Sequence, residues 1–484
     1  MNRRVLRNLA MALLVGVTLA GCVKEYTITV VSNNDAWGTV TGTGTYAFGE
    51  EITITATPAT GYYFQRWDDG VNTNPRIVTV EGTKIYTAVF ASNDGGDTDP
   101  PGGGTDPTTV SGTINENTTW RDLGLAVDYV VSGTLYVDGN ALLTIEPGVT
   151  IMFDGVNGGM QVGENAGISM VGTAQKPIVF TGPTNNPNNG SWNHIVIYSV
   201  RNDNRLEYVQ ILRGGSDDGN WRAPLEIQGK VHMKNCLIDG SLGNGLTTEY
   251  SGAFYSFENN TIKNCASYAW KTENNASLYS GIGDGNVFEN NGKNMIWVNN
   301  SSVTLTDHVT LKKMPIPYYF PNGYSVNDAY RYTIEPGTVM LFGSNTRFDI
   351  SSETTLKAEG TAAEPIVIRG LEDEAGYWNG IMWYSIKAAS VMDYCQVSGS
   401  GYSESYGEAC NLFLYDNARG TISNCTFSKS QYYGVGIDRV SDMENITHSN
   451  NTFSQCAEGN VWIEGGGEYN GTTYTDDQIL PDLP

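Results

Sequence analysis

Several charged residues in one polar stretch of the sequence could take part in catalysis. Arg201 and Arg213 are candidate bases, and Asp217-Asp218 is an acidic pair that could hold Ca²⁺. A cationic base beside metal-binding carboxylates is the arrangement that β-elimination of an acidic polysaccharide requires. Further charged residues of the same stretch are Asp203 and Arg205. We favour the alternative that these charged residues belong to surface loops, because loops vary in sequence more than the strands that they connect.

Aromatic residues offer a second kind of chemistry, the binding of sugars. The chain has 28 Tyr and 10 Trp, and an exposed ring can stack on a sugar while Asn and Asp bind its hydroxyls. Trp221, between Asn220 and Arg222, is the best candidate. With Trp221 we group Arg213, Asp217 and Asp218 as a predicted ligand-binding site. Other aromatic candidates are Trp270, Trp297, Tyr318-Tyr319, Trp383, Tyr384 and Tyr432-Tyr433.

Motifs of other enzyme classes are missing from the sequence. It contains no G-x-S-x-G or H-E-x-x-H motif, no phosphate-binding loop and no dinucleotide-binding fingerprint. Glu207 and Asp393 occupy equivalent places in two similar segments, so they are expected in separate parts of the fold and not around one glycosidic bond. We therefore assign no catalytic residue and expect no cofactor.

Cysteine and histidine residues give no sign of a metal site. The four His are scattered and no C-x-x-C pair exists, which disfavours zinc. Apart from Cys22, the cysteines lie in apolar, strand-like runs, so burial in the interior is favoured over disulfides, although an exported protein could form them. These cysteines are Cys236, Cys265, Cys395, Cys410, Cys425 and Cys456.

The N-terminal segment has the pattern of an export signal. Arg3, Arg4 and Arg7 precede an apolar run that is too short to span a bilayer and ends in Leu-Ala-Gly-Cys22. This ending resembles the lipobox of bacterial lipoproteins, which implies cleavage before Cys22 and acylation of that cysteine. Val23 follows instead of Asp, which favours an outer-membrane or surface location. An ordinary secretory signal is the alternative.

Charge excludes several classes of partner. The net charge is −24, and removal of the three N-terminal Arg would make it −27. Such a chain repels phosphate backbones and anionic lipid surfaces, so we expect no nucleic-acid partner and no membrane contact beyond a lipid anchor. Gly is abundant and charged residues make up only 17%, which is typical of turn-rich β proteins.

Residues 26–90 consist of short alternating runs separated by glycines, which predicts a small β domain. Residues 38–70 resemble the divergent InlB B-repeat family, a β-grasp-like module of bacterial surface proteins. Trp67 with Asp68-Asp69 could form a sugar platform, but a core Trp followed by a turn is the interpretation we favour. Residues 92–107 contain only Ser, Asn, Asp, Gly, Thr and Pro, which predicts a solvated hinge.

The rest of the chain is internally duplicated. TIEPGVTIMF at 144–153 recurs as TIEPGTVMLF at 333–342, and WNHIVIYS at 192–199 recurs as WNGIMWYS at 378–385. Trp192 and Trp378 thus share one position, which suggests packing inside the fold. A finer spacing near 25 residues, with Gly and Asn at the bends, predicts a β-solenoid of about fifteen turns.

This duplicated region resembles right-handed parallel β-helix proteins, in particular surface lipoproteins with the same TIEPG and Trp-x-x-Ile stretches. The resemblance implies the fold and leaves the function open, because β-helices include lyases, hydrolases and adhesins. The leading prediction is a lipid-anchored surface protein whose non-catalytic β-helix binds a polysaccharide or a host glycoprotein. A polysaccharide lyase or glycoside hydrolase and a structural spacer are the alternatives.

The predicted fold class is all-β, a right-handed parallel β-helix preceded by a small β-grasp-like domain. The predicted segments are a signal peptide at 1–21, the B-repeat-like domain at 22–91, the linker at 92–107, two β-helix copies at 108–310 and 311–464, and a polar tail at 465–484, expected to be a loose cap or a disordered end.

Overall fold

The computed structural model describes residues 24–69, 71–92, 106–216, 222–273, 276–403 and 409–484. Cys22, Asp217, Asp218 and Trp221 lie outside these residues, so the predictions made for them stay predictions. The chain divides into two compact units, residues 1–98 and 99–484. In the described part of the chain, no helix is long and apolar enough to cross a membrane.

The first unit is a small β domain with two sheets. Its strands are β1 (Glu25–Ser32), β2 (Gly38–Thr41), β3 (Gly44–Ala47), β4 (Glu51–Pro58), β5 (Tyr62–Trp67), β6 (Arg76–Thr79) and β7 (Lys84–Ser92). One sheet has the order β3-β1-β7-β5 and the other the order β2-β4-β6. Trp67 is fully buried in the core and its Nε1 donates to the carbonyl of Thr73 at 3.1 Å, which confirms the prediction of a core Trp.

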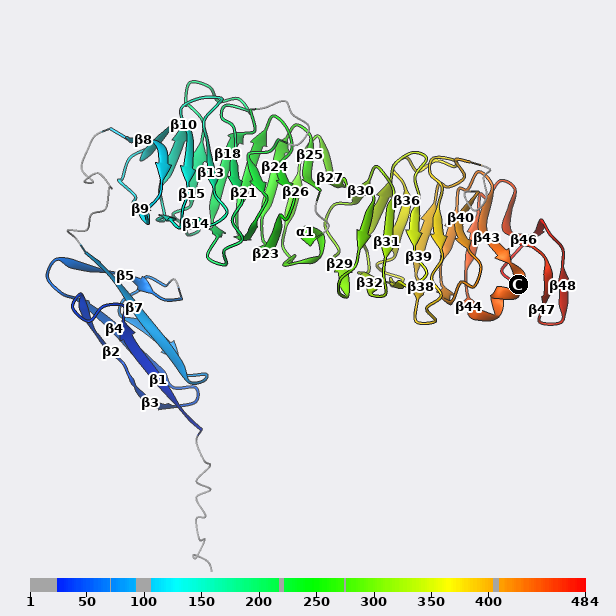
Figure 1. Ribbon diagram of the computed structural model, residues 1–484, viewed down its shortest axis with the longest axis horizontal. Helices are drawn as coiled ribbons and strands as arrows, with labels where there is room; N and C mark the ends of the chain where they lie inside the picture. Colours follow the sequence, from blue (N-terminus) through cyan, green and yellow to red (C-terminus); the bar gives the residue numbers. More distant parts are fainter. Residues whose placement is uncertain (1–23, 70, 93–105, 217–221, 274–275, 404–408) are drawn as a thin grey trace, which may run out of the picture. The chain divides into compact units, whose positions relative to one another are not determined.

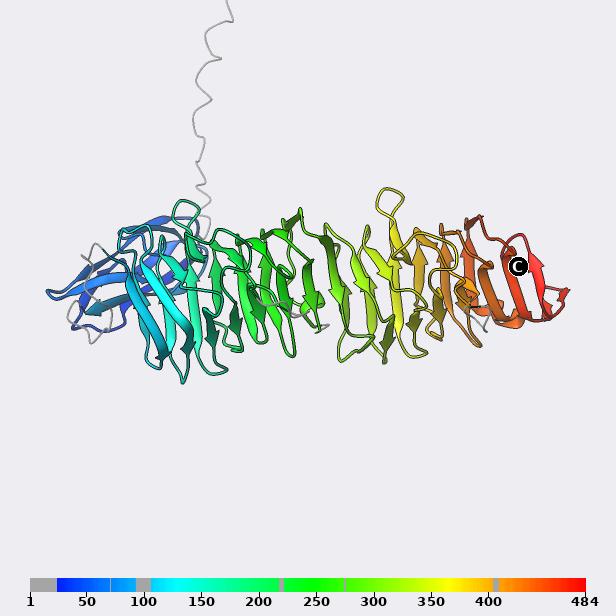
Figure 2. The same ribbon diagram turned by 90° about the horizontal axis from the view of Figure 1, so that it is seen from above.

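The second unit is a right-handed β-helix with about 13 turns, fewer than the fifteen expected. Its strands run across the long axis and stack in parallel (Figures 1 and 2). Turns that carry loops are longer than 25 residues. The register pairs Ile151 with Phe180 and Phe180 with Ile211 are examples of such turns.

Three stacks of strands, called A, B and C, form the first copy. Strands β8 (Thr108–Ile114) and β10 (Tyr129–Val137) pass through both A and B. Stack A continues with β12 (Thr150–Phe153), β15 (Ile178–Thr181), β18 (Val209–Gly214), β21 (Leu237–Ser241), β24 (Thr261–Cys265) and β26 (Val287–Glu289). Stack B continues with β13 (Gly159–Val162), β16 (Ile195–Ile197), β19 (Leu225–Ile227), β22 (Leu246–Thr248), β25 (Tyr268–Thr272) and β27 (Lys293–Val298). Stack C contains β9 (Thr118–Trp120), β11 (Leu142–Ile145), β14 (Gly167–Val171), β17 (Arg205–Glu207), β20 (Lys230–Lys234) and β23 (Ala253–Glu258).

The second copy repeats this arrangement in stacks A′, B′ and C′. Stack A′ contains β30 (Tyr318–Phe320), β33 (Val339–Phe342), β36 (Ile366–Gly370), β39 (Cys395–Ser398), β42 (Thr426–Ser428) and β45 (Thr452–Ser454). Stack B′ contains β28 (Ser302–Thr304), β31 (Tyr324–Asn327), β34 (Phe348–Ile350), β37 (Ile381–Trp383), β40 (Cys410–Leu414), β43 (Tyr433–Arg439), β46 (Gly459–Gly465) and β49 (Gln478–Leu480). Stack C′ contains β29 (Val309–Leu311), β32 (Arg331–Ile334), β35 (Thr355–Glu359), β38 (Val391–Asp393), β41 (Gly420–Ser423) and β44 (Ile446–Ser449).

At the junction of the two copies, the stacks of the second copy do not continue the corresponding stacks of the first. Strand β27 pairs with β25 of stack B on one side and with β30 of stack A′ on the other, so stack A′ continues stack B. The short helix α1 (Ala276–Tyr279) lies at this junction (Figure 1). Its Tyr279 is bonded through its hydroxyl to those of Tyr324 and Tyr332 in the second copy, which ties the two copies together.

One continuous apolar core runs through the β-helix. Trp192 and Trp378 are fully buried in it, and each Nε1 donates to a backbone carbonyl, of Leu212 at 2.8 Å and of Ser398 at 2.7 Å. The prediction that this repeated Trp packs inside the fold is confirmed. The six cysteines of the described residues form no disulfide; those from Cys236 to Cys425 are buried and Cys456 is half-buried, as the apolar runs predicted.

Asparagines hold the bends between strands. Cys236 N–H donates to Asn260 Oδ1 at 3.0 Å, and Asn260 N–H donates to Asn286 Oδ1 at 3.1 Å on the next turn. Asn235 and Asn259 adopt positive φ, a conformation that Asn tolerates better than most residues. The recurrent Asn therefore has a structural role.

The C-terminal residues close the β-helix. Strand β49 pairs antiparallel with β46, and β47 (Gly467–Tyr469) pairs with β48 (Thr472–Tyr474) beside the 3-10 helix η1 (Val440–Asn445). Of the two alternatives for residues 465–484, the structure shows a cap (Figure 1).

Candidate functional site

The outward side of stack B carries a line of residues that pair in register from turn to turn. We call it the B row; its members are Tyr136, Gln161, Val196, Glu226, Thr247, Lys271, Trp297 and Tyr319. Their neighbours along the strands, such as Leu225 and Ile227, point into the core. At a strand spacing of about 4.8 Å, the B row extends over roughly 34 Å.

Acidic residues gather around the middle of the B row. Glu226 is almost buried, and its carboxylate accepts a hydrogen bond from Gln228. Glu249 lies two residues beyond Thr247, and Glu273 follows β25 on the next turn, where its N–H donates to the carbonyl of Thr248 at 2.9 Å. The charges of Glu226 and Glu273 both act on Glu249, so the three carboxylates lie close together.

Burial and mutual repulsion change how these acids titrate. Burial, assisted by the negative charges of Glu226 and Glu273, raises the pKa of Glu249 to about 7. Burial likewise raises the pKa of Glu226. At neutral pH, Glu249 can therefore both donate and accept a proton, a property that often marks functional sites.

Lys271 supplies positive charge within the same face. It is fully buried, and its Nζ lies 3.4 Å from the centre of the Trp297 ring. Burial lowers the pKa of Lys271 to about 8, although the charges of Glu249 and Glu273 act in the opposite direction. The Trp297 ring in turn stacks on Tyr268, with 5.1 Å between ring centres.

The buried polar atoms of this face include the hydroxyl of Thr247, which is fully buried between Glu226 and Lys271 in the B row, and Oε1 of Glu249. Neither of these two atoms makes a hydrogen bond to a described residue, which costs about 1–3 kcal/mol each. Both are closed to solvent, so a ligand can reach Glu249 only through the exposed part of its side chain.

Exposed aromatic rings flank the acids. Tyr136 is 44% exposed at the start of the B row, and Tyr250, directly after Glu249, is 73% exposed. Tyr198 lies near the carboxylates, since burial and the charges of Glu226 and Glu249 raise its pKa. We call these acids, aromatics, Thr247 and Lys271 together the acidic–aromatic face.

The second copy has a different chemistry on the equivalent stack. Phe413 takes the place of Glu226, and Met382 that of Val196. Met382, Cys410 and Phe413 form a separate apolar cluster, against which Tyr433 and Trp462 pack. The duplicated interiors are alike, whereas the outward residues differ.

The charged residues proposed from the sequence that the structure describes lie in different parts of the first copy. Arg201 is ion-paired with Asp203 and also donates to the carbonyls of Asn140 and Asn165. Arg205 pairs with Glu207 on stack C. Arg213 lies on stack A with positive φ and donates to Thr181 Oγ1 at 2.6 Å.

Among the aromatic candidates, Trp270, Trp383 and Tyr318 belong to the core and cannot stack on a sugar; for Trp383, in the same strand run as Trp378, packing inside the fold was the favoured interpretation. Inward and outward positions alternate in these strands, and each of the three falls on an inward one. Trp297 does lie on the acidic–aromatic face, and Tyr319 lies on the next turn of the B row.

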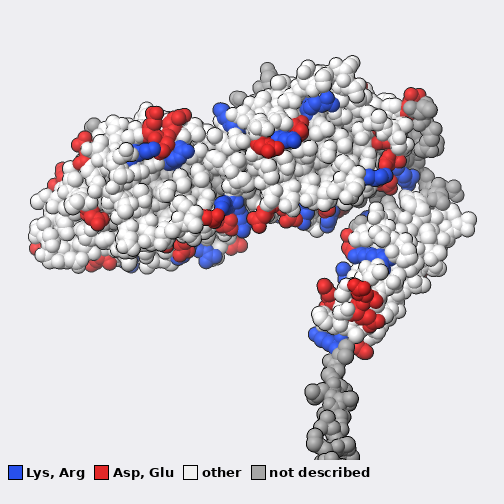
Figure 3. All heavy atoms as spheres, turned by 180° about the vertical axis from the view of Figure 1, so that it is seen from behind, with Lys and Arg blue, Asp and Glu red and all other residues white. Residues whose placement is uncertain are grey.

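The rest of the described surface has fewer features of a binding site. Among the described residues, no group of three or more His, Cys, Asp or Glu could hold a metal ion. On the side shown in Figure 3, Lys and Arg lie beside Asp and Glu in small groups separated by uncharged surface. Pairs such as Lys312 with Glu335, at 2.7 Å, are half-exposed and contribute little.

Family models match three parts of the chain. Residues 26–94 match the divergent InlB B-repeat domain, residues 112–218 the pectate-lyase like beta helix domain, and residues 374–475 the right handed beta helix region. Comparisons with curated proteins and with solved structures gave no match. The fold and these matches identify the chain as a right-handed β-helix protein that carries a divergent InlB B-repeat domain ahead of the β-helix.

Proposed function

We propose that this protein is a non-catalytic binding protein for a linear polysaccharide or the glycan of a glycoprotein, and that the acidic–aromatic face is its binding site. The observation that carries the proposal is the B row. It aligns the rings of Tyr136, Trp297 and Tyr319 with the carboxylate of Glu226 along one side of a straight stack, and Glu249 and Glu273 lie beside it.

The length and chemistry of the face suit a sugar polymer. Rings such as Tyr136 and Tyr250 can stack on sugar faces, and the half-buried carboxylates of Glu249 and Glu273 can bind hydroxyls. At a strand spacing of about 4.8 Å per turn, the B row is roughly 34 Å long. This length has room for several consecutive sugar units.

Charge narrows the class of glycan. Glu226, Glu249 and Glu273 lie close enough to influence one another, and only Lys271 and Arg222 offset them in the interactions that shift the pKa of Glu249. Neutral and amine-bearing glycans should therefore bind better than uronic-acid polymers, whose carboxylates would be repelled.

The test is affinity electrophoresis of the soluble chain from Val23 onward in gels that contain a neutral mannan, a glucosamine polymer or polygalacturonate. We expect retardation by one of the first two and none by polygalacturonate. Replacement of Tyr136 and Tyr250 by Ala should weaken retention at least tenfold. Tyr330→Ala is the matched control, since Tyr330 is 37% exposed beside His308, away from the B row. Equal retention of both variants would refute the proposed site.

We further propose that Cys22 is acylated and anchors the protein at the outer membrane, facing outward. The Leu-Ala-Gly-Cys22 ending of the apolar N-terminal run supports this, and the acyl chains of a lipoprotein anchor firmly. Labelling with a clickable palmitate analogue should mark the wild type and not Cys22→Ser. Protease added to intact cells should degrade the β-helix if it faces outward.

A second candidate function, hydrolysis of the bound glycan, is favoured by one observation. The pKa of about 7 places Glu249 where a general acid operates, with two further carboxylates nearby. New reducing ends formed by the wild type and not by Glu249→Gln, at unchanged glycan retention, would make the protein an enzyme.

A further inference from the structure

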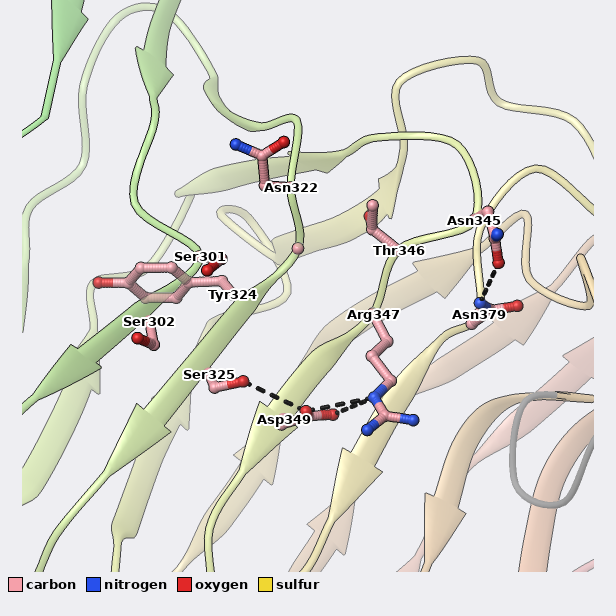
Figure 4. A pocket seen from close by; sticks show the side chains of 11 residues that line it. Ser301, Ser302, Asn322, Tyr324, Ser325, Asn345, Thr346, Arg347, Asp349 and Asn379 are labelled. Atoms are coloured by element: carbon pink, nitrogen blue, oxygen red, sulfur yellow. Dashed lines mark hydrogen bonds and ion pairs between the residues drawn. The ribbon is translucent and has the colours of Figure 1, made fainter.

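A polar pocket of about 370 Å³ lies on the outward side of stack B′, at its first strands (Figure 4). Ser302, Ser325 and Asp349 come from three successive strands and pair in register. Loop residues between the strands supply Asn345, Arg347 and Asn379. The volume lies within the range of small-ligand pockets.

The charges in this pocket cancel. Arg347 Nε lies 2.9 Å from Asp349 Oδ1 and 3.2 Å from Oδ2, and Ser325 Oγ donates to Oδ2 at 3.2 Å (Figure 4). Because the guanidinium and the carboxylate neutralise each other, the pocket selects neither an anion nor a cation. Its remaining polar groups are hydroxyls and amides.

Asn379 leaves a polar atom unsatisfied at the pocket. The residue is only 3% exposed; its Nδ2 donates to Asn345 Oδ1 at 2.9 Å, and its Oδ1 has no hydrogen-bond partner among the described residues. Exchange of O and N in both amides would leave a donor unsatisfied instead. Asn193, its counterpart in the first copy, also lacks a partner for Oδ1. The repeat thus contains this asparagine twice, and in the second copy it lines a pocket of hydroxyls and amides.

The pocket has no aromatic platform. The ring of Tyr324 belongs to the core, and its hydroxyl is bonded to Tyr279, so only the backbone of Tyr324 can meet a ligand. A ligand here is therefore held through hydrogen bonds around its edge. This arrangement suits a single unit seated in an open pocket better than a unit in the middle of a stacked polymer.

We propose that this pocket binds one neutral, hydroxyl-rich unit, a monosaccharide that is either free or at the end of a glycan. Sugar hydroxyls both donate and accept hydrogen bonds, as the serine and asparagine side chains of the pocket require. The site uses other strands than the acidic–aromatic face, so it does not depend on that face.

Ser325→Tyr is the most informative variant. In the first copy, Tyr136 pairs with Gln161 as Ser325 pairs with Asp349 here. A tyrosine at this place is therefore compatible with a turn of the β-helix, and its ring would fill the pocket. Val287→Ala is the control, because Val287 is 44% exposed on β26 of stack A and belongs neither to this pocket nor to the acidic–aromatic face.

The experiment is a saturation-transfer NMR titration of the chain from Val23 onward with neutral hexoses, 6-deoxyhexoses, N-acetylhexosamines and short oligosaccharides ending in each. We expect at least one sugar to bind the wild type and Val287→Ala equally, and Ser325→Tyr at least tenfold more weakly at an unchanged melting temperature. Binding of oligosaccharides alone would assign the pocket to a glycan end, and binding of free sugars to a monosaccharide. Absence of binding by every sugar, or equal binding by Ser325→Tyr, would overturn the proposal whatever the result for polymers.

Discussion

The ammonium group of Lys271 lies 3.4 Å from the centre of the Trp297 ring, and the two residues are register partners on adjacent turns of stack B. The contact holds a buried cation beside Glu249 and Glu273, whose charges favour its protonation. A cation over an aromatic face is stabilised most where water is excluded. Lys271 therefore links the aromatic and acidic parts of the face.

Loss of this cation should make Glu249 harder to ionise. The charge of Lys271 lowers the pKa of Glu249, so Lys271→Met should raise that pKa further above 7. Carboxyl ¹³C NMR titration of Glu-labelled protein measures it. Lys293→Met is the control, since Lys293 lies 4.5 Å over the Tyr268 ring and is not among the groups that shift Glu249. An equal shift in both variants would contradict the assigned role of Lys271.

Stability should depend on pH through Glu249. Its pKa is about 7 in the folded chain against an ordinary value of 4.5, so the folded state binds the proton more tightly. The free energy of unfolding should therefore fall as the pH rises from about 4.5 to about 7. Glu249→Gln should remove this part of the decrease, about 1 kcal/mol after allowance for solvent screening. Urea denaturation at pH 5 and pH 8 measures the difference, and an identical pH dependence in the variant would count against the raised pKa.

The stability of the B-repeat domain should depend on Trp67. This side chain is completely buried, so Trp67→Ala should destabilise the domain by about 3–5 kcal/mol. Ile77→Ala is the control because Ile77 is 67% exposed. Calorimetry of the whole chain should show a lower melting transition for the small domain while that of the β-helix stays in place. A shift of the β-helix transition would show that the two units do not unfold independently.

The asparagine ladder should contribute to the stability of the β-helix. Asn260 accepts from Cys236 N–H and donates to the carbonyl of Met233, both at 3.0 Å. Asn260→Ala leaves these buried groups without a partner and should cost about 1–3 kcal/mol. The exposed Asn300→Ala should change stability by less than about 0.5 kcal/mol. Chemical denaturation measures both, and similar values would remove the structural role assigned to the ladder.

The repeated segments predicted the fold because a strand buried in every turn must keep its apolar pattern. Trp192 and Trp378 show this, as each occupies the same core position of its copy. The junction could not be predicted in this way. It depends on strand β27, which belongs to stack B and yet begins stack A′.

Apart from Trp297, the residues of the acidic–aromatic face could not be grouped from the sequence, because they follow no fixed period. Val196 pairs with Glu226 after 30 residues, Glu226 with Thr247 after 21, and Thr247 with Lys271 after 24. The lengths of the loops set these intervals, so only the register of the folded strands brings the residues together. The signal in the sequence was a charged residue between two apolar ones, as in Leu225-Glu226-Ile227.

The location of the binding site can be tested by hydrogen–deuterium exchange with and without the retained glycan. We expect slower exchange in peptides that cover residues 225–228, 246–250 and 268–273, which form the middle of the acidic–aromatic face. We expect no change in the equivalent turns of the second copy, where Phe413 replaces Glu226. Glycan retention with protection confined to other stacks, or to the B-repeat domain, would contradict the proposed location.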